Sequence, residues 1–387
     1  MNRARQLRVT ATALALAMVG IACAQGTTTV GGSRWDVGVV IDTAALSRAL
    51  PLGARDKGFG LGHSDLTVTG SLGRLFDLRL TGAVHTHDRK LEADLEEASL
   101  STRTLPAGIT MKLGRFAAQL GYLNEQHPHA DDFVERPLPY RAFFGQHWFD
   151  DGLRINWTLP TTLYAQLGLE VFRGRGLVPH AQSSRRPGAL VISAKTGGDI
   201  GSSQAWQAGL ALIDNRRELL SEDDDGHSHH GEHTHDHSHN HAHGAAFTGR
   251  RGWVADVVWK WSPAGNSRNE QLRVSAEVMR FERLNRFARR GDHHQGGYLS
   301  VVYRFQPAWE AGVSTGWIDV RIPHDDHFHS GRLRETSLML AYKPTHMQTV
   351  RLQATRVTGA RGFGEVPRQM IAAQWILAFG AHPAHAF

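Results

Sequence analysis

The sequence predicts an all-β protein, a transmembrane antiparallel β-barrel of about sixteen strands. Three observations predict this fold class. Apolar and polar residues alternate in most segments after residue 30, these segments run for about ten residues, and short and long connections between them alternate along the chain. A period of two gives each strand one apolar face, and strands of about ten residues are long enough to cross a bilayer when tilted.

The alternation is clearest in the middle of the chain. Residues 153–159 read LRINWTL, with each odd position apolar and each even position polar. Residues 272–278 read LRVSAEV and alternate in the same way, with the even-numbered residues apolar. A soluble β-sandwich would show this period too. Aromatic residues such as Trp253 and Tyr342 gather at strand ends, however, and the polar faces carry charges of both signs, which suits a girdled membrane barrel with a wet lumen.

Sixteen segments are expected to form the barrel strands. They are 34–46, 64–72, 75–84, 91–102, 108–116, 152–159, 162–172, 189–196, 204–214, 252–262, 270–282, 296–305, 308–318, 334–342, 347–356 and 369–380. Residues 91–100 (LEADLEEASL) also fit a short acidic helix, so both readings of this segment stay open.

The connections divide the barrel into two unlike ends. Short turns are expected after the even-numbered strands and long polar loops after the odd-numbered ones, as in outer-membrane barrels with periplasmic turns and extracellular loops. By this count both termini are periplasmic, and 21 of the 24 histidines fall in extracellular loops. Nine lie in one run, and the others are His63, His85, His87, His127, His129, His147, His180, His293, His294, His324, His327 and His329.

The first 24 residues have the pattern of a cleaved signal peptide. Three arginines precede an apolar stretch at 9–21, and Ala22–Ala24 (ACA) forms a small-residue cleavage site. Residues 25–387 would then form a single barrel domain. A lipoprotein modified at Cys23 is the alternative, although Gly20 stands where a larger aliphatic residue is usual.

Composition excludes several classes of function. Cys23 is the only cysteine, so a chain that loses it with the signal has no disulfides and no Cys-ligated zinc or iron–sulfur site. The signal also carries three of the six net positive charges, and the mild excess that remains gives no case for nucleic-acid binding. No later stretch reaches the roughly 18 apolar residues of a transmembrane helix.

Residues 226–244, GHSHHGEHTHDHSHNHAHG, are the sharpest chemical feature of the sequence. With so few apolar residues, the connection 215–249 is expected to be a mobile extracellular loop. Neutral imidazole binds Zn²⁺, with Cu²⁺ and Ni²⁺ as alternatives, and should release metal as pH falls past about 6.5. A low-complexity loop that binds metal without using it is the other reading. The candidate ligands are His227, His229, His230, His233, His235, His237, His239, His241 and His243.

Two smaller groups have the same chemistry. His324, His327 and His329 surround two aspartates, and Asp292–His294 reads DHH. Either group could add ligands to the histidine-rich loop if the barrel brings them together. Ordinary solvated loop residues are the simpler reading, because charged loop tips are common.

The long loop after the fifth strand could fold inward and narrow the barrel. Acidic groups at a constriction favour cations. A surface loop whose turns are set by prolines is the alternative. The candidate constriction residues are Glu125, His127, His129, Asp131 and Asp132, and the charged residues expected in the lumen are Arg154, Glu170, Asp256, Arg273, Glu277 and Arg304.

Several stretches resemble one family. They are Leu113–Arg115, Gly121–Val134, Asp151–Arg154, Gly197–Gly201, Trp259–Pro263 and the terminal GAHPAHAF. Together they resemble the phosphate-selective-porin-like superfamily and, more narrowly, its branch labelled zinc-regulated outer-membrane receptor or porin. The resemblance covers most of the mature chain and implies an outer-membrane barrel with an aqueous channel. It also implies a link to zinc supply and, from relatives, a homotrimer.

Two details bear on this resemblance. A final strand running out to Phe387 resembles the insertion signal of outer-membrane barrels, which implies the barrel-assembly machinery as a partner. The label TonB-dependent receptor, in contrast, does not fit, because only about ten residues separate the signal from the first strand and leave no room for a plug. The mixed charges of the lumen also do not imply the anion selectivity of the phosphate-selective relatives.

The expected function is a porin-like channel in the outer membrane lipid that captures divalent metal, zinc first, and admits it by diffusion. No enzyme is expected, because no nucleophile, P-loop or dinucleotide motif is present. Two alternatives stay open. One is a surface metal-binding barrel that does not conduct, and the other is a general or anion-preferring porin with an incidental histidine-rich loop.

Overall fold

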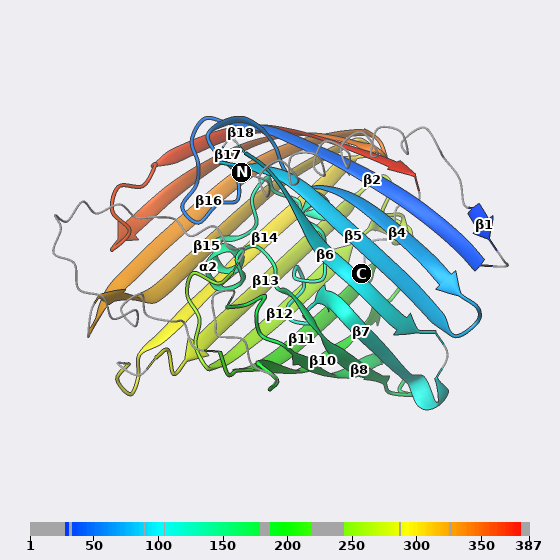
Figure 1. The fold of residues 1–387 in the computed structure, drawn as a ribbon. Helices are drawn as coiled ribbons and strands as arrows, with labels where there is room; N and C mark the ends of the chain where they lie inside the picture. Colours follow the sequence, from blue (N-terminus) through cyan, green and yellow to red (C-terminus); the bar gives the residue numbers. More distant parts are fainter. Residues whose placement is uncertain are drawn as a thin grey trace, which may run out of the picture.

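The computed structural model describes residues 28–30, 33–88, 90–103, 105–178, 186–217, 244–285, 288–324 and 327–380. Sixteen antiparallel strands close into a barrel (Figure 1). The predicted signal peptide, the histidines from His227 to His243 and Phe387 lie outside the described residues, so the predictions about them stay predictions.

Each barrel strand pairs with the next one along the chain, and the last pairs with the first to close the barrel. Two short strands, β1 (Thr28–Val30) and β3 (Gly58–Leu61), pair with the first barrel strand. The barrel strands are β2 (Ser33–Leu46), β4 (Ser64–Leu72), β5 (Phe76–His87), β6 (Lys90–Thr102), β7 (Ile109–Ala117), β8 (Phe149–Thr158), β9 (Tyr164–Phe172), β10 (Ala189–Ile200), β11 (Gln204–Asn215), β12 (Arg251–Trp261), β13 (Gln271–Glu282), β14 (His293–Gln306), β15 (Trp309–His324), β16 (His327–Thr345), β17 (Gln348–Arg361) and β18 (Gln369–Gly380).

The fold class and all sixteen predicted strands are confirmed. Residues 91–100 belong to β6, so the alternative reading of this segment as a helix is wrong. The described helices are short: α2 (Leu138–Phe144) and the 3-10 turns η1 (Pro106–Gly108), η2 (Pro128–Ala130) and η4 (Pro263–Gly265). None of the helices in the described ranges is long and apolar enough to cross a membrane.

The two ends of the barrel carry connections of different length. Two connections do not follow the predicted alternation of short turns and long loops. The connections β5–β6 and β15–β16 span two residues each and are not long loops, because their strands continue pairing almost to the hairpin tip. Seven histidines predicted in loops lie in strands, five of them beside these two hairpins and two at the start of β14, all near the end that carries the long connections. They are His85, His87, His293, His294, His324, His327 and His329. We call this end the long-loop end and the other the short-turn end.

The outer surface carries the apolar band expected of a membrane barrel. Along β15, Trp309, Val313 and Trp317 share the outward face, and Trp309 packs on Tyr342 with ring centroids 4.7 Å apart. Val313 pairs with Leu338 of β16, whose side chain is 60% exposed. Leu338 therefore lies midway between two aromatic levels, which is where the centre of a bilayer would sit.

Replacing Leu338 with arginine should lower the free energy of unfolding by about 2–4 kcal/mol, because a cation at the bilayer midplane loses its hydration. Urea unfolding of the barrel refolded into lipid vesicles measures the change, with Leu338→Met as the control that stays apolar. An arginine variant as stable as wild type would mean that this face does not contact lipid.

The long-loop half of the lumen is filled. Residues 118–148, between β7 and β8, fold into the barrel, where all seven residues of α2 are buried and α2 packs on β14 and β15 (Figure 1). Phe143 and Phe144 contact Phe281 of the barrel wall in an apolar core that reaches most strands. The alternative reading of this segment as an ordinary surface loop is therefore wrong, and we call it the inner loop.

Candidate functional site

The inner loop is fastened to the barrel wall by ion pairs. Glu125 accepts hydrogen bonds from Arg154 of β8 at 2.8 Å and from Lys195 of β10 at 2.9 Å. Burial would raise the pKa of Glu125, but Lys195 and Arg154 outweigh burial and lower that pKa to about 2. Arg154 also donates to Glu170 of β9 at 2.5 Å. Glu125 therefore stays charged and holds the loop to two strands.

Further contacts hold the other side of the inner loop. Asp132 forms an ion pair with Arg273 of β13, and Asp131 accepts from Arg136 within the loop at 2.9 Å. The acidic side chains Glu125, Asp131 and Asp132 are thus compensated by cations. These three residues therefore do not present unpaired negative charge at a constriction: Glu125 and Asp132 pair with cations of the barrel wall, and Asp131 pairs with a cation of the loop itself.

The remaining lumen residues also make structural contacts. Glu277 accepts hydrogen bonds from Tyr140 of α2 at 2.8 Å and Tyr298 of β14 at 2.7 Å. Arg304 pairs with Glu310 on the neighbouring strand. Asp256 of β12 is buried, and its Oδ1 has no hydrogen-bond partner among the described residues. All of them face the interior from strands whose other face is apolar.

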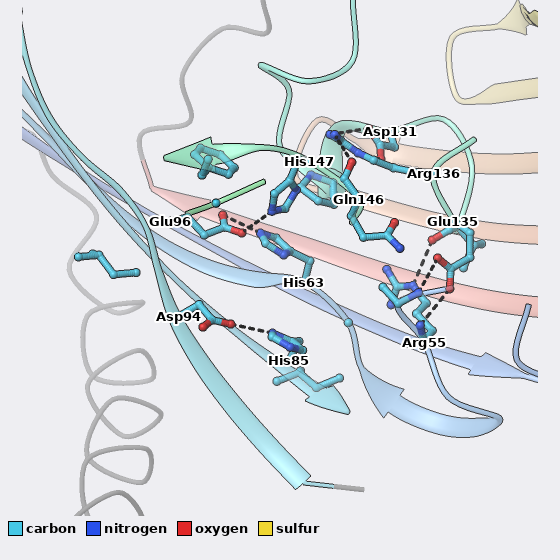
Figure 2. Close-up of a pocket in the computed structure, with 18 of the residues that line it drawn as sticks. Arg55, His63, His85, Asp94, Glu96, Asp131, Glu135, Arg136, Gln146 and His147 are labelled. Carbon is cyan, nitrogen blue, oxygen red and sulfur yellow. Dashed lines mark hydrogen bonds and ion pairs between the residues drawn. The ribbon is translucent and has the colours of Figure 1, made fainter. Parts of the chain in front are cut away.

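Four histidines and two carboxylates meet between the inner loop and the wall formed by β4–β6. Figure 2 shows His63 and His147 converging on Glu96, with Nε2 to carboxylate distances of 3.0 and 3.1 Å. His129 Nδ1 lies 2.9 Å from Asp65 Oδ2. The members of this histidine–carboxylate cluster are His63, Asp65, Glu96, His127, His129 and His147.

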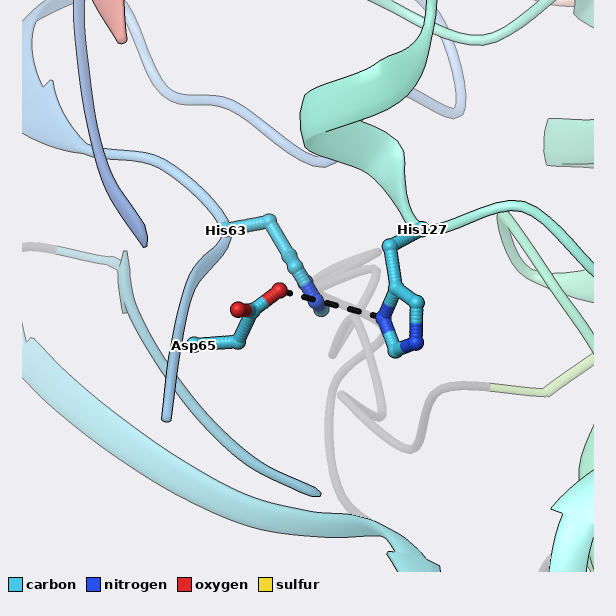
Figure 3. Close-up of side chains that lie close together, drawn as sticks. All are labelled: His63, Asp65 and His127. Atoms are coloured by element: carbon cyan, nitrogen blue, oxygen red, sulfur yellow. Dashed lines mark ion pairs between the residues drawn. The ribbon is translucent and has the colours of Figure 1, made fainter. Parts of the chain in front are cut away.

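His127 stands at the centre of the cluster. Its Nδ1 lies 3.6 Å from Glu96 Oε2 and 3.8 Å from Asp65 Oδ2, longer than hydrogen bonds. His63, Asp65 and His127 point toward one another, and one ligand atom from each lies within 4.8 Å of the other two (Figure 3). Imidazole and carboxylate groups at this spacing are ligands for divalent metal.

Burial and charge act differently on two of these histidines. Burial lowers the pKa of His147 to about 4, which leaves its imidazole neutral at pH 7. Burial also acts to lower the pKa of His63, but the carboxylates of Glu96 and Asp65 outweigh it and raise that pKa. The two acids, both less than 10% exposed, are thus the dominant charges of the cluster.

A β-bulge in β6 places Glu96 in the cluster. Thr81 of β5 pairs with Glu97 and Gly82 pairs with Leu95, so Glu96 is an extra residue between two regular pairs. Side chains normally alternate between faces, but the extra residue turns both Glu96 and Glu97 into the lumen, where they are 6% and 4% exposed. The neighbours then differ: Glu97 pairs with Lys112 at 2.7 Å, whereas Glu96 meets only histidines.

The cluster lies between two cavities along the same wall. A cavity of about 130 Å³ toward the long-loop end is lined by His63, Glu96 and His147. A larger cavity of about 650 Å³, which extends to the short-turn end, is lined by His127 and Glu97. Phe149 lines both. The adjacent carboxylates of the bulge therefore face different cavities, and the cluster forms the partition between them.

Sequence reasoning found part of this site. His127 and His129 were among the predicted constriction residues, and His63 and His147 were placed only as loop histidines. Asp65 is not found by sequence reasoning because a lone acid in a strand has no distinctive pattern, and Glu96 is not found either. The adjacent acids Glu96-Glu97 were an available signal, since a regular strand would point one of them into lipid.

The other predicted ligands lie elsewhere. His324 pairs with His327 across the β15–β16 hairpin, and the rings of His327 and His329 are 4.9 Å apart. His294 Nδ1 accepts a hydrogen bond from the Arg321 backbone at 3.1 Å. No described contact joins these residues to the histidine–carboxylate cluster.

Comparison with known proteins gives the fold. No family model matches the chain. An uncharacterized protein of Aquifex aeolicus (strain VF5) is 25% identical over 358 residues, which cover 86% of this chain and 70% of that protein. Among solved structures, OmpTdeltaL8, an outer membrane protein of Vibrio cholerae, is similar with a TM-score of 0.57, 11% identity and coverage of 90% and 99%.

Two further solved structures are similar to this chain in fold. The outer membrane channel DcaP of Acinetobacter baumannii has a TM-score of 0.55 and 11% identity, covering 92% of this chain and all of that one. An anion-selective porin from Comamonas acidovorans has a TM-score of 0.54 and 12% identity over 90% and 100%. By their names, the Acinetobacter protein is a channel and the Comamonas protein is a porin. The chain is therefore similar in fold to outer-membrane porins, which supports an outer-membrane location.

Proposed function

We propose that this protein is an outer-membrane channel that admits divalent metal ions, zinc first, together with other small solutes. The observation that carries the proposal is the histidine–carboxylate cluster on the partition between two lumen cavities. A metal ion that moves along this wall must pass imidazole and carboxylate groups, the ligands that divalent metals select.

The histidine-rich run at 226–244 fits the same function. It follows β11 at the long-loop end, which in outer-membrane barrels is the extracellular end. Its nine imidazoles would raise the local metal concentration above the pore, with copper and nickel as alternative cargo. This role agrees with the zinc-regulated branch that the sequence resembles. We also propose a homotrimer and assembly through the C-terminal Phe387, as in related barrels.

A general or anion-preferring porin with an incidental histidine-rich loop is the second candidate, and the charges of the larger cavity bear on it. The larger cavity is lined by Arg34, Arg79, Arg103 and Lys112, against Asp36, Asp77, Glu97 and Glu125. These charges balance in number, so the vestibule alone does not select cations. If the channel selects divalent cations, as first proposed, the selection depends on the histidine–carboxylate cluster at the end of this cavity.

Planar-bilayer recording of the refolded chain tests the proposal. We expect single channels in KCl whose current falls when micromolar Zn²⁺ is added, because a bound ion blocks K⁺ while it crosses, and Zn²⁺ entry into liposomes that carry a zinc-sensitive dye. A variant with the nine histidines of 226–244 changed to glutamine, the Gln-loop variant, should take up Zn²⁺ more slowly at low concentration and normally at high concentration.

The other outcomes separate the alternatives. Channels whose reversal potential shows anion preference, with no Zn²⁺ entry, would support the second candidate. Metal binding without current would identify a surface-binding barrel. Equal zinc uptake by wild type and the Gln-loop variant at every concentration would remove the capture role from the histidine-rich run and leave the channel.

A further inference from the structure

We propose that His63, Asp65, Glu96 and His127 form a single binding site for one divalent metal ion, which ties the inner loop to the barrel wall. The inference deepens the proposed function and rests on it for its role in transport. The binding itself is measurable in a barrel that does not conduct.

The four ligand groups are of the types that zinc selects, and three of their separations are close to those of a zinc site. In a tetrahedral zinc site with bonds of about 2.0–2.1 Å, neighbouring ligand atoms lie about 3.3 Å apart. His63 Nε2 and Glu96 Oε2 are 3.0 Å apart, and His127 Nδ1 lies 3.6 Å from Glu96 Oε2 and 3.8 Å from Asp65 Oδ2. The ligand atoms that all lie within 4.8 Å of one another are those of His63, Asp65 and His127, so side-chain rotation is needed to bring all four groups to bonding distance around one ion.

Two more histidines hold the carboxylates in place. His147 Nε2 lies 3.1 Å from Glu96 Oε1, which leaves Oε2 directed at His63 and His127. His129 Nδ1 lies 2.9 Å from Asp65. Metal-binding carboxylates are commonly oriented by hydrogen bonds of this kind, which also exclude alternative rotamers. The cluster therefore has four ligand groups and two partners that orient them.

Charge balance also points to a cation. Asp65 and Glu96 are 2% and 6% exposed, and every ion pair that the structure gives them is with a histidine. Other acids of the inner loop and lumen, such as Glu97 and Glu125, have a lysine or arginine partner. Two buried carboxylates need a compensating charge of about two, and one divalent ion supplies it while the histidines stay neutral and free to act as ligands.

A polar atom without a partner lies where the ion would bind. His127 Nδ1 is buried and makes no hydrogen bond within the described residues. The nitrogen faces carboxylate oxygens of Glu96 and Asp65 at 3.6 and 3.8 Å, beyond hydrogen-bond distance. Coordination of an ion in this gap would satisfy it.

The four ligands come from different parts of the chain, so a bound ion would link those parts together. Asp65 and Glu96 come from β4 and β6, His63 from the connection before β4, and His127 from the inner loop. An ion bound by all four joins the inner loop to the barrel wall at the partition between the two cavities. Bound metal should therefore add to the ion pairs that hold the inner loop in the lumen.

Cobalt titration of the Gln-loop variant tests the site, because changing its nine histidines removes the largest group of competing ligands. We expect one Co²⁺ per chain, visible d–d absorption typical of four-coordinate nitrogen and oxygen ligands, and displacement by Zn²⁺. His127→Ala and Asp65→Asn should each weaken binding more than about 100-fold, and His147→Ala about 10–100-fold. Heat-modifiable gel mobility verifies that each variant is folded, and Asp65→Asn keeps the side-chain shape if His127→Ala does not fold.

His85→Ala is the matched control. His85 lines the same small cavity and its side chain is 13% exposed, as are those of His63 and His127, but it pairs with Glu92 and Asp94 instead of the cluster. Its removal should leave Co²⁺ affinity unchanged. Equal losses in His85→Ala and His127→Ala, or no Co²⁺ binding by the Gln-loop variant, would overturn the assignment. If the protein conducts but does not bind Co²⁺, the metal site proposed here is wrong. If it binds Co²⁺ but does not conduct, the proposed channel function is wrong and the metal site stands.

Discussion

Replacing residues 119–147 with a short glycine-rich turn should raise single-channel conductance several-fold. The structure makes this change feasible, because Ala118 N donates to Trp148 O at 2.9 Å, so the two ends of the inner loop are already adjacent and β7 and β8 can close as a hairpin. A barrel of sixteen strands leaves an aqueous channel when nothing fills it, and the inner loop fills the long-loop half of the lumen.

Bilayer recording gives the conductance, and the same variant should lose its response to Zn²⁺ because it lacks His127. Shortening the β12–β13 turn within residues 264–268, at the short-turn end, is the control that should leave conductance unchanged. If the lumen collapses around its exposed apolar side chains, near-UV circular dichroism will change together with the current. An unaltered conductance in a folded variant would show that ions pass by a route that the inner loop does not obstruct.

Changing Arg141 to methionine should lower the free energy of unfolding by about 3–5 kcal/mol. Arg141 is the anchor of α2: it is 2% exposed, forms an ion pair with Glu335 of β16 and donates to Pro51 O at 2.6 Å. Removing it leaves Glu335, 6% exposed, as a buried carboxylate without its cation. The desolvation of that charge, more than the lost contact, accounts for the size of the effect.

The double variant Arg141→Met/Glu335→Met separates these two causes. Because it removes both charges and keeps the volume, it should recover most of the lost stability. Urea unfolding in detergent micelles, followed by tryptophan fluorescence, gives the three free energies. A single variant within about 1 kcal/mol of wild type, or a double variant as unstable as the single one, would contradict the assignment of Arg141 as a buried anchor.

The strands were predictable because the bilayer requires apolar residues, and the lumen polar ones, at alternate positions. That the inner loop fills half of the lumen was not predictable in this way. Along β13, Arg273 and Glu277 share the inward face with Met279 and Phe281. The inward face thus changes from polar to apolar toward the long-loop end, which is where the inner loop packs. The available signal was that near the end of β13 the apolar residues Met279 and Phe281 occupy the inward positions while Arg280 and Glu282 occupy the outward ones. An expectation of a water-filled lumen along the whole strand does not account for this pattern.

The candidate site was predictable only on its loop side. His127 and His129 lie in a stretch dense in metal-binding residues, whereas Asp65 and Glu96 lie in strands. Whether the loop histidines contact these acids depends on how deeply the inner loop enters the barrel and on the register of β6. Neither can be predicted from the local sequence. A non-local arrangement of this kind follows from the closed barrel, because side chains from separate strands point toward one axis.

The bulge at Glu96 has a consequence for how such a site arises. Deleting Glu96 would restore regular pairing between β5 and β6 and leave every later side chain on its present face, whereas a one-residue deletion elsewhere in β6 would turn part of the strand inside out. Strand length can therefore change by one residue at this point with little harm to the barrel. A single inserted or deleted codon would be enough to give a channel of this shape its buried carboxylate or take it away.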